Sequence, residues 1–397
     1  MARHSAFRLL VLVSLLAISL VPGGLPQAAA NSDPFGSARP AATFSAPANY
    51  IVLGAHISPV PTYPTEIRNF ENRVRRTAEI IMYFNPWDRL TEDPKTHVGP
   101  CDNGFLPRQV DYNAPAKPGM IGGHVIMITW EPLTGFLGTP GPAAYDNVLN
   151  HQYDSLIDTC ANELKAWSNK TFLIRFMHEM NIADEDWWAG QPYNRKPDGT
   201  GDTDKFKQVW RYVWQRFHNL GVTNVQWVWS PNFASNPGVA WNNMNNYYPG
   251  DQYVDWIGLS GYNWMGPIPF QSYSFLYNAV LTDLQCRYAK PIMHAEIGSA
   301  PYSNNNDSPP NKEGWIAYAF QRAQAFPLVR AFVWFNDYAQ HNTNSADFRV
   351  WTSTDFSYPS PDNWSSVPDS VTNAYASAIA DSSFTSSYNS SQLLNLP

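Results

Sequence analysis

The chain has 397 residues, of which 44% are hydrophobic, 15% aromatic and 15% charged, enough for a large core in one barrel or in two ordinary domains. Its formal net charge is −7, and an acidic protein is a poor partner for nucleic acid or anionic membranes. The 16 tryptophans and 21 tyrosines suit stacking on flat, amphipathic ligands such as pyranose rings, although a large barrel also buries many aromatic side chains.

Residues 1–30 predict a secretory signal peptide. Arg3 and Arg8 give a positive start, and the apolar stretch over residues 9–21 is too short to cross a bilayer. Alanines at 28–30 offer a cleavage site. We therefore expect a secreted protein without a membrane partner once the signal is removed; a retained N-terminal anchor is the alternative.

Residues 31–48 are rich in Ala, Pro and Ser and predict a short linker, and residues 381–397 are rich in Ser and Asn and predict a flexible tail. Between them, over residues 49–380, short apolar runs typical of buried parallel strands recur eight times. These runs are Tyr50–His56, Glu79–Phe84, His124–Trp130, Phe172–His178, Val225–Ser230, Val254–Gly261, Pro291–Ile297 and Val329–Phe335.

Helical patterns separate these runs. The segment 204–220 carries an apolar stripe at helical spacing, and Gly221 follows where a C-terminal cap would lie. Similar stripes cover residues 149–164 and 315–323. A doubly wound sheet also alternates strands and helices, but no Gly-rich fingerprint follows the first run. Eight strand–helix units predict the α/β class and a single-domain (β/α)8 TIM barrel, whose site lies at the C-terminal ends of the strands.

Three cysteines, Cys101, Cys160 and Cys286, permit one disulfide in an oxidising compartment. Cys101 and Cys160 flank the predicted third strand, so this pair is favoured, while the other pairings stay open. The cysteine spacing is not that of a zinc site. We expect neither a metal nor a cofactor.

Two glutamates, Glu179 and Glu296, end the fourth and seventh apolar runs. Cleavage of a glycosidic bond requires one carboxylic acid and one carboxylate, and these strand ends meet across the mouth of a barrel. An isolated glutamate at a strand end more often has a surface or ion-pair role. Apolar neighbours such as Met177 and Met180 should desolvate Glu179 and raise its pKa.

Three further residues near these strand ends are candidates for substrate binding. Arg175 and His178 are expected to orient the site by hydrogen bonds. Trp130, at the end of the third run, is expected to form an aromatic platform for a sugar, with core packing as the alternative.

Several motifs resemble those of glycoside hydrolase family 26. The stretch His178-Glu-Met-Asn181, followed by Trp187-Trp188, resembles the acid/base segment of that family. The stretches Trp-Val-Trp-Ser-Pro-Asn at 227–232 and Tyr-Val-Asp-Trp-Ile-Gly-Leu-Ser-Gly-Tyr at 253–262 are also similar, and Ala-Glu-Ile-Gly at 295–298 resembles the nucleophile strand. The similarity covers about residues 50–350, which is nearly the whole predicted barrel.

This family comprises retaining (β/α)8 enzymes, mostly endo-β-1,4-mannanases, with some members that act on mixed-linkage β-glucan or β-1,3-xylan. The resemblance implies Glu179 as acid/base and Glu296 as nucleophile. It also implies that His178 contacts the sugar or the nucleophile and that Tyr262 hydrogen-bonds the nucleophile. Trp188 and Trp334 would be the sugar-stacking platforms.

The sequence departs from the family pattern in two places. Five residues, Ile-Ala-Asp-Glu-Asp, separate Asn181 from Trp187, which leaves open whether Trp187 or Trp188 lines the site. Glu131 stands where several family mannanases carry histidine, and it either contacts a sugar hydroxyl or is structural.

Taken together, the motifs predict a secreted, monomeric, retaining endo-β-glycosidase that needs no cofactor. Its expected substrate is a plant or microbial polysaccharide, foremost β-1,4-mannan or glucomannan. The alternatives are a β-1,3-1,4-glucanase, a β-1,3-xylanase, an exopolysaccharide hydrolase and, from another class, a carbohydrate-binding barrel without turnover.

Overall fold

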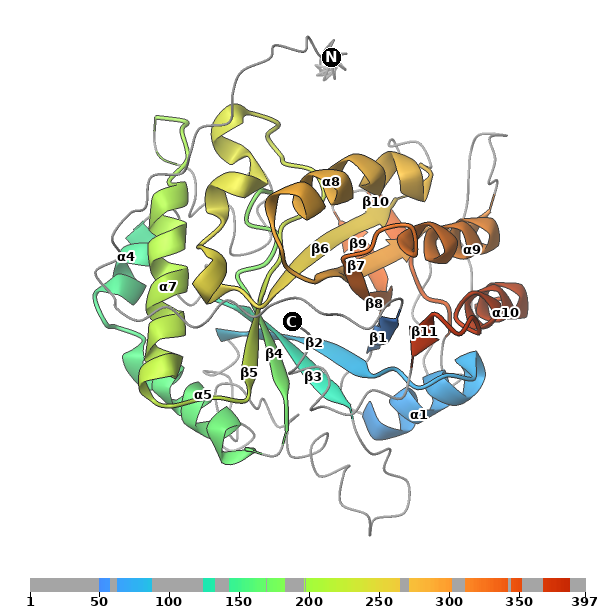
Figure 1. Ribbon diagram of the computed structural model, residues 1–397, viewed down its shortest axis with the longest axis horizontal. Coiled ribbons are helices and arrows are strands. Elements are labelled where there is room, and N and C mark those ends of the chain that lie inside the picture. The colour runs from blue at the N-terminus through green and yellow to red at the C-terminus, as the bar shows by residue number, and fades with distance from the viewer. Residues whose placement is uncertain are drawn as a thin grey trace, which may run out of the picture. The chain divides into compact units, whose positions relative to one another are not determined.

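The protein folds around eight parallel strands that close into a barrel (Figure 1). The computed structural model describes residues 50–57, 63–87, 124–132, 143–168, 170–182, 196, 198–264, 271–301, 311–341, 344–351 and 367–385, all within one unit, 41–397. The barrel strands are β1 (Ile51–Ile57), β2 (Ile80–Pro86), β3 (Val125–Glu131), β4 (Phe172–Phe176), β5 (Val225–Trp229), β6 (Trp256–Asn263), β7 (Ile292–Ser299) and β8 (Val329–Asn336). They pair in sequence order, and β8 closes the barrel on β1, so the predicted TIM barrel is confirmed.

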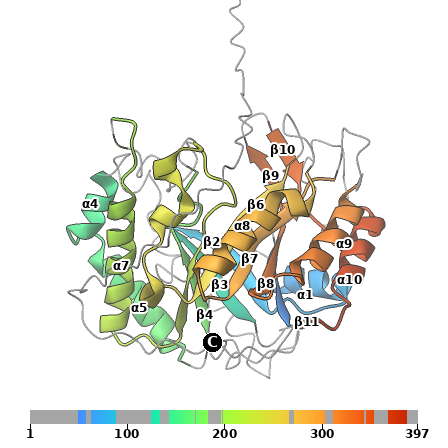
Figure 2. The same cartoon turned by 45° about the horizontal axis from the view of Figure 1, so that its top comes forward.

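Helices surround this barrel, as Figures 1 and 2 show. They are α1 (Tyr63–Val74), α4 (Ala143–Leu149), α5 (Asp154–Ala166), α7 (Thr203–Asn219), α8 (Tyr273–Arg287), α9 (Lys312–Ala323) and α10 (Asp369–Ala378). Three short 3-10 helices follow β5: η4 (Ala240–Asn242), η5 (Met244–Tyr247) and η6 (Asp251–Tyr253). The longest of the helices within the described residues, α7, begins where the Asp202 side chain accepts from the Lys205 N–H. It ends before Gly221, whose φ of 71° favours glycine.

Alternation along the strands divides the apolar residues between two cores. One set fills the barrel interior and includes Val52, Met82, Met127, Leu173, Val228, Met293 and Val333. The alternate positions point outward and pack against helix residues such as Phe70, Leu164 and Trp210. Side chains in a strand alternate between two faces, so every second residue points into the barrel and the others point out towards the helices. We call this inward or outward assignment the parity of a residue; only residues of inward parity can reach the barrel mouth.

Beyond β8, the chain forms a two-stranded antiparallel hairpin of β9 (Tyr338–His341) and β10 (Asn344–Asp347). After α10 it returns to the barrel, where β11 (Phe384–Thr385) pairs with Ile51 and Val52 of β1. The Phe384 ring packs edge-on against Phe320 at 5.2 Å. The expected flexible tail therefore does not begin at residue 381, because residues up to 385 are tied to the barrel; residues 386–397 lie outside the described part.

The predicted signal peptide and linker also lie outside the described residues. Within the part of the chain that the structure describes, no helix is long and apolar enough to cross a membrane. Cys160 is disulfide-bonded and Cys286 is a free, exposed thiol. Both states are those expected if the favoured disulfide joins Cys160 to Cys101. Cys101 is outside the described residues.

Candidate active site

Glu179 is brought to the barrel mouth by a turn directly after β4. Met177 and Glu179 have positive φ values of 46° and 50°, which side-chain-bearing residues seldom adopt. Hydrogen bonds hold this turn: the Met177 N–H donates to the Trp130 carbonyl at 3.2 Å, and the Glu179 N–H donates to the Ser230 carbonyl at 2.6 Å. The neighbouring strands thereby hold a strained backbone that positions the Glu179 side chain.

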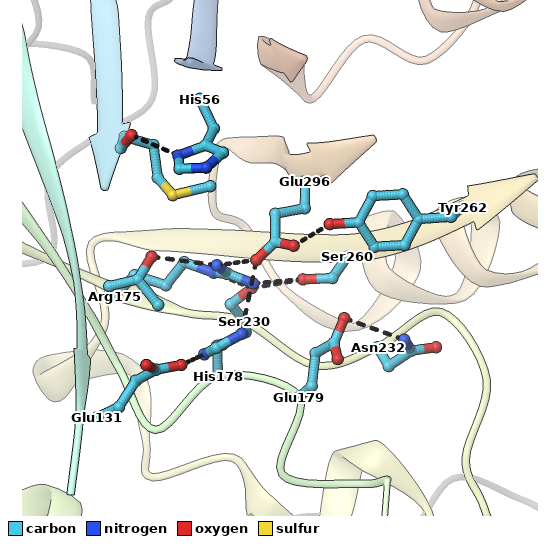
Figure 3. A network of polar contacts seen from close by, with 12 residues as sticks. His56, Glu131, Arg175, His178, Glu179, Ser230, Asn232, Ser260, Tyr262 and Glu296 are labelled. Carbon is cyan, nitrogen blue, oxygen red and sulfur yellow. Dashed lines mark hydrogen bonds and ion pairs between the residues drawn. The ribbon is translucent and has the colours of Figure 1, made fainter. Parts of the chain in front are cut away.

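Glu296 is brought to the same mouth by an irregularity in β7. His294 pairs with Leu259 of β6, yet Glu296 pairs with the next residue, Ser260. Ala295 is thus the extra residue of a β-bulge, a feature that re-aims side chains beside active sites. With Ala295 bypassed, Glu296 takes an inward parity and Ile297 packs into the outer core. Figure 3 shows both glutamates in the same group of polar side chains, Glu296 linked to Arg175, Tyr262 and His178, and Glu179 linked to Asn232.

Arg175 of β4 holds one oxygen of the Glu296 carboxylate. Its guanidinium donates to Oε1 of Glu296, to Oγ of Ser230 at 2.9 Å and to Oγ1 of Thr129 at 3.2 Å. The arginine is fully buried and its donors are directed at protein acceptors. Arg175 therefore orients the site by hydrogen bonds, as expected, and it does so by positioning Glu296 and not by reaching into the mouth to bind substrate.

Tyr262 of β6 holds the other oxygen of this carboxylate. Its hydroxyl donates to Oε2 of Glu296. Burial and, second, the charge of Glu296 raise the pKa of the Tyr262 hydroxyl well above its usual value, so the hydroxyl stays protonated and able to donate. Glu296 is only 4% exposed and accepts from Arg175 and Tyr262 at once, which a carboxylate does best.

Glu179 has a different environment. It is 5% exposed, and its Oε1 accepts from Nδ2 of Asn232 at 3.1 Å. Burial raises the pKa of Glu179 well above the ordinary 4.5, and the charge of Glu296 raises it further; Arg175 and hydrogen bonds from Asn232 and Ser260 oppose the shift. This is the direction expected from its apolar neighbours, and it keeps Glu179 protonated where an ordinary glutamate would ionise.

Asn181, the last residue of the His-Glu-Met-Asn stretch, organises the loop that carries Asn232. Its Oδ1 accepts from the Asn232 N–H at 2.8 Å, and its Nδ2 donates to the Asn232 carbonyl at 3.0 Å. Asn181 is fully buried. It therefore acts on Glu179 indirectly, by fixing the side chain that donates to it.

His178 lies between two carboxylates. Its Nδ1 is 3.4 Å from Oε1 of Glu131, and its Nε2 is 3.5 Å from Oε1 of Glu296. Burial and the nearby Arg175 charge lower the pKa of His178 well below its usual value, so the neutral ring carries one N–H. Glu131 has the inward parity of β3 and is 7% exposed, which places the residue that the sequence left undecided inside the site.

Two predicted sugar platforms are contradicted by the structure. Trp130 and Trp334 are both fully buried and belong to the outer core between barrel and helices. The Trp130 ring packs 5.7 Å from Phe176, and the Trp334 indole donates to the Phe348 carbonyl at 2.9 Å. Each side chain points away from the barrel interior, so neither ring can face a sugar in the mouth. The third platform, Trp188, and its rival Trp187 lie outside the described residues.

The inward-facing positions include one aromatic residue, Phe335, that the sequence did not suggest as part of the site. Phe335 of β8 is one position after Trp334 and stacks on His56 at 4.9 Å. The His56 ring donates through Nδ1 to the Met82 carbonyl at 3.0 Å, and its Nε2 lies 3.5 Å from Oδ2 of Asp337. These residues form the β1–β8 side of the mouth, and counting alternate positions back from the strand ends would have found them.

Glycoside hydrolases use two carboxyl groups that are held in different environments. The two buried glutamates at the barrel mouth form such a pair. Across the described ranges, no group of three or more His, Cys, Asp and Glu is arranged to hold a metal ion.

Comparison with known proteins supports a family assignment. Residues 101–284 match the model of Glycosyl hydrolase family 26. Endoglucanase H of Acetivibrio thermocellus is 26% identical over 352 residues, 86% of this chain and 32% of that protein. Mannan endo-1,4-beta-mannosidase A and B of Caldalkalibacillus mannanilyticus is 28% identical over 212 residues, 51% of this chain and 37% of that protein. The chain thus spans about a third of the length of these relatives.

The fold agrees with this match. The structure of a family 26 β-mannanase from Bacteroides ovatus superposes with a TM-score of 0.55 at 14% identity, covering 85% of this chain and 90% of that one. These matches support assignment of the chain to glycoside hydrolase family 26.

Proposed function

We propose that this chain is a secreted, retaining endo-β-glycosidase that hydrolyses β-1,4-mannan or glucomannan. The observation that carries the proposal is the contrast between the two glutamates. Arg175 and Tyr262 donate to both oxygens of Glu296, whereas burial and the charge of Glu296 keep the Glu179 carboxyl protonated. Secretion rests on the signal peptide predicted in residues 1–30, and a monomer remains the expected state.

In the first step, a carboxylate oxygen of Glu296 attacks the anomeric carbon while Glu179 gives its proton to the leaving glycosidic oxygen. The bond from the anomeric carbon to that oxygen breaks, and a glycosyl ester forms on Glu296. The rigid donors Arg175 and Tyr262 suit a group that must attack carbon directly, because they fix where its oxygens lie.

In the second step, Glu179, now a carboxylate, removes a proton from water. The water oxygen attacks the anomeric carbon and releases Glu296, so the anomeric configuration is retained. Loss of the negative charge of Glu296 in the ester removes one cause of the raised pKa of Glu179, and this favours Glu179 as the base of the second step.

The substrate class is supported by the family and by relatives named as mannan endo-1,4-beta-mannosidases. A β-glucan is the second candidate, because the relative that aligns with 86% of this chain is named an endoglucanase. Glu131 is a second reason to keep the β-glucan candidate, because it stands in the mouth where several family mannanases carry histidine. Its carboxylate could accept hydrogen bonds from sugar hydroxyls.

The test is to incubate wild type, Glu296→Ala and the control Glu163→Ala with mannan, glucomannan, mixed-linkage β-glucan and β-1,3-xylan, and to follow reducing ends. Glu163 lies on α5, outside the barrel. Manno-oligosaccharides from wild type and control but not from Glu296→Ala are expected. Activity confined to mixed-linkage glucan would select the second candidate, and undiminished activity of Glu296→Ala would refute the nucleophile.

Retention is tested separately by proton NMR of the first-formed product. The β-anomer is expected at early times, before mutarotation. An α-anomer as the first product would exclude double displacement.

A further inference from the structure

Lys312, the first residue of α9, is buried in an unusual way. It is fully buried, and its Nζ donates to the carbonyl oxygens of Asp347 and Arg349, both at 2.8 Å. Burial lowers its pKa to about 7, and a cation at a helix N-terminus also opposes the helix dipole. An apolar side chain in this place would leave the two buried carbonyl oxygens without their donor, so the lysine fixes the backbone that carries them.

The two carbonyls that Lys312 holds flank a single residue, Phe348. The backbone of Phe348 is itself bonded on both sides: its N–H donates to the Asp337 carbonyl at 3.1 Å, and its carbonyl accepts from the Trp334 indole at 2.9 Å. The segment directly after β10 is therefore fixed at four points around one phenylalanine. Two of these four bonds come from the Lys312 ammonium group.

The Phe348 side chain points back into the active site. Its ring stacks on the ring of Tyr262, with centroids 4.7 Å apart and planes inclined by 30°, and it meets Trp264 edge-on at 5.0 Å. Gly298, two residues after Glu296, leaves the space for this contact, since a Cβ there would lie 3.0 Å from Phe348 atoms. The face of Tyr262 thus rests on Phe348 while its hydroxyl donates to Glu296.

We propose that Lys312 is a positioning residue, which fixes Phe348 as the platform that aims the Tyr262 hydroxyl at Glu296. The inference rests on the proposed role of Glu296 as nucleophile. A hydroxyl that drifts by a fraction of an ångström loses much of its hydrogen bond to the carboxylate, and misplacement of a catalytic group lowers kcat. Lys312 touches neither the substrate nor Glu296, so its effect passes through Phe348 and Tyr262.

A double-mutant cycle tests this route. Lys312→Met keeps the length of the side chain and removes its donors. Alone, it is expected to lower kcat about tenfold with little change in KM; in the Tyr262→Phe background it should cost less than about twofold, because the group it positions is already gone. Equal losses of kcat in the two backgrounds would overturn the proposal.

Asn224→Ala is the matched control. Nδ2 of Asn224 also donates to backbone carbonyls, those of Leu164, Trp167 and Lys170 at 2.8–3.1 Å, but it lies just before β5, at the opposite end of the strands. It should lower the melting temperature without changing kcat well below that temperature. Should Lys312→Met fail to fold, Lys312→Gln keeps a polar donor and enters the same cycle.

A second measurement does not depend on turnover. In protein labelled with ε-¹³C tyrosine, the resonance missing from Tyr262→Phe identifies Tyr262. This resonance should shift or broaden in the Lys312 variant and stay in place in Asn224→Ala. An unmoved resonance would overturn the positioning role, whereas a moved resonance in a protein inactive on every polysaccharide would support it and refute the proposed function alone.

Discussion

Asn232 donates a hydrogen bond to Glu179 at 3.1 Å, and removing it should change the pH dependence of catalysis. Glu179 must be protonated in the first step, so kcat/KM falls as the pH rises through the pKa of Glu179. The bond from Asn232 stabilises the carboxylate and lowers this pKa. In Asn232→Ala the pKa should therefore rise, and the alkaline limb of the profile should move to higher pH.

The magnitude follows from the hydrogen bond. A bond to a charged acceptor contributes about 1.5–3 kcal/mol and one to a neutral acceptor about 1 kcal/mol, and one pKa unit corresponds to about 1.4 kcal/mol. The difference of about 0.5–2 kcal/mol should thus move the alkaline limb upward by about 0.4–1.4 units.

The assay is kcat/KM against pH on a soluble substrate, with Asn246→Ala as the control. Asn246 belongs to the same chain segment after β5 but donates to the carbonyls of Ala240 and Trp241, so its profile should match wild type. A limb that stays in place or moves to lower pH in Asn232→Ala would refute Glu179 as the group that titrates.

Three further predictions concern the same architecture. Arg175→Met should lower kcat/KM at least about 100-fold because it leaves the buried Glu296 without its cationic donor, and steady-state kinetics with less than about threefold loss would contradict this. Trp130→Ala should lower the free energy of unfolding by about 3–5 kcal/mol in urea denaturation, with KM unchanged; a raised KM would restore its role as a platform. Burial raises the pKa of Glu79 to about 8, so its contribution to stability is present below about pH 4.5 and lost as the pH rises towards 8. Glu79→Gln should therefore have the same melting temperature as wild type at pH 4.5 and a higher one at pH 8. Equal melting temperatures at pH 8 would refute the raised pKa of Glu79.

Much of the barrel was predictable because its signal is local and repeated. Eight apolar runs mark the strands, and the observed strand bounds differ from the expected ones by only a few residues, as at β1 and β8. Parallel strands buried on both faces are uniformly apolar, so the runs reveal where strands lie but not which side chains point inward. The error at Trp130 arose from this limit, whereas Trp334 was put forward by the family resemblance.

Parity could have been recovered in the regular strands from the few polar residues that a barrel interior tolerates. Thr129 and Arg175 both contact the Glu296 network, and counting two residues onward from Thr129 reaches Glu131 rather than Trp130. On β8, the same alternation sends Trp334 outward and Phe335 inward. An aromatic residue at a strand end is therefore a platform candidate only after its face has been assigned.

The two glutamates themselves escape such counting, because each lies where the strand geometry is broken. Met293 and Ala295 both belong to the interior core, so strict alternation would send Glu296 outward; only the bulge at Ala295 turns it inward. Glu179 follows a turn with two positive φ values, for which the residues Met177 and Glu179 give no propensity signal. Their place at the ends of apolar runs singled out both residues, and the motif resemblance gave them roles, whereas strict alternation could not show which way they point. The structure adds the physical reason: irregular backbone, held by bonds from neighbouring strands, aims two carboxyl groups from β4 and β7 into one network.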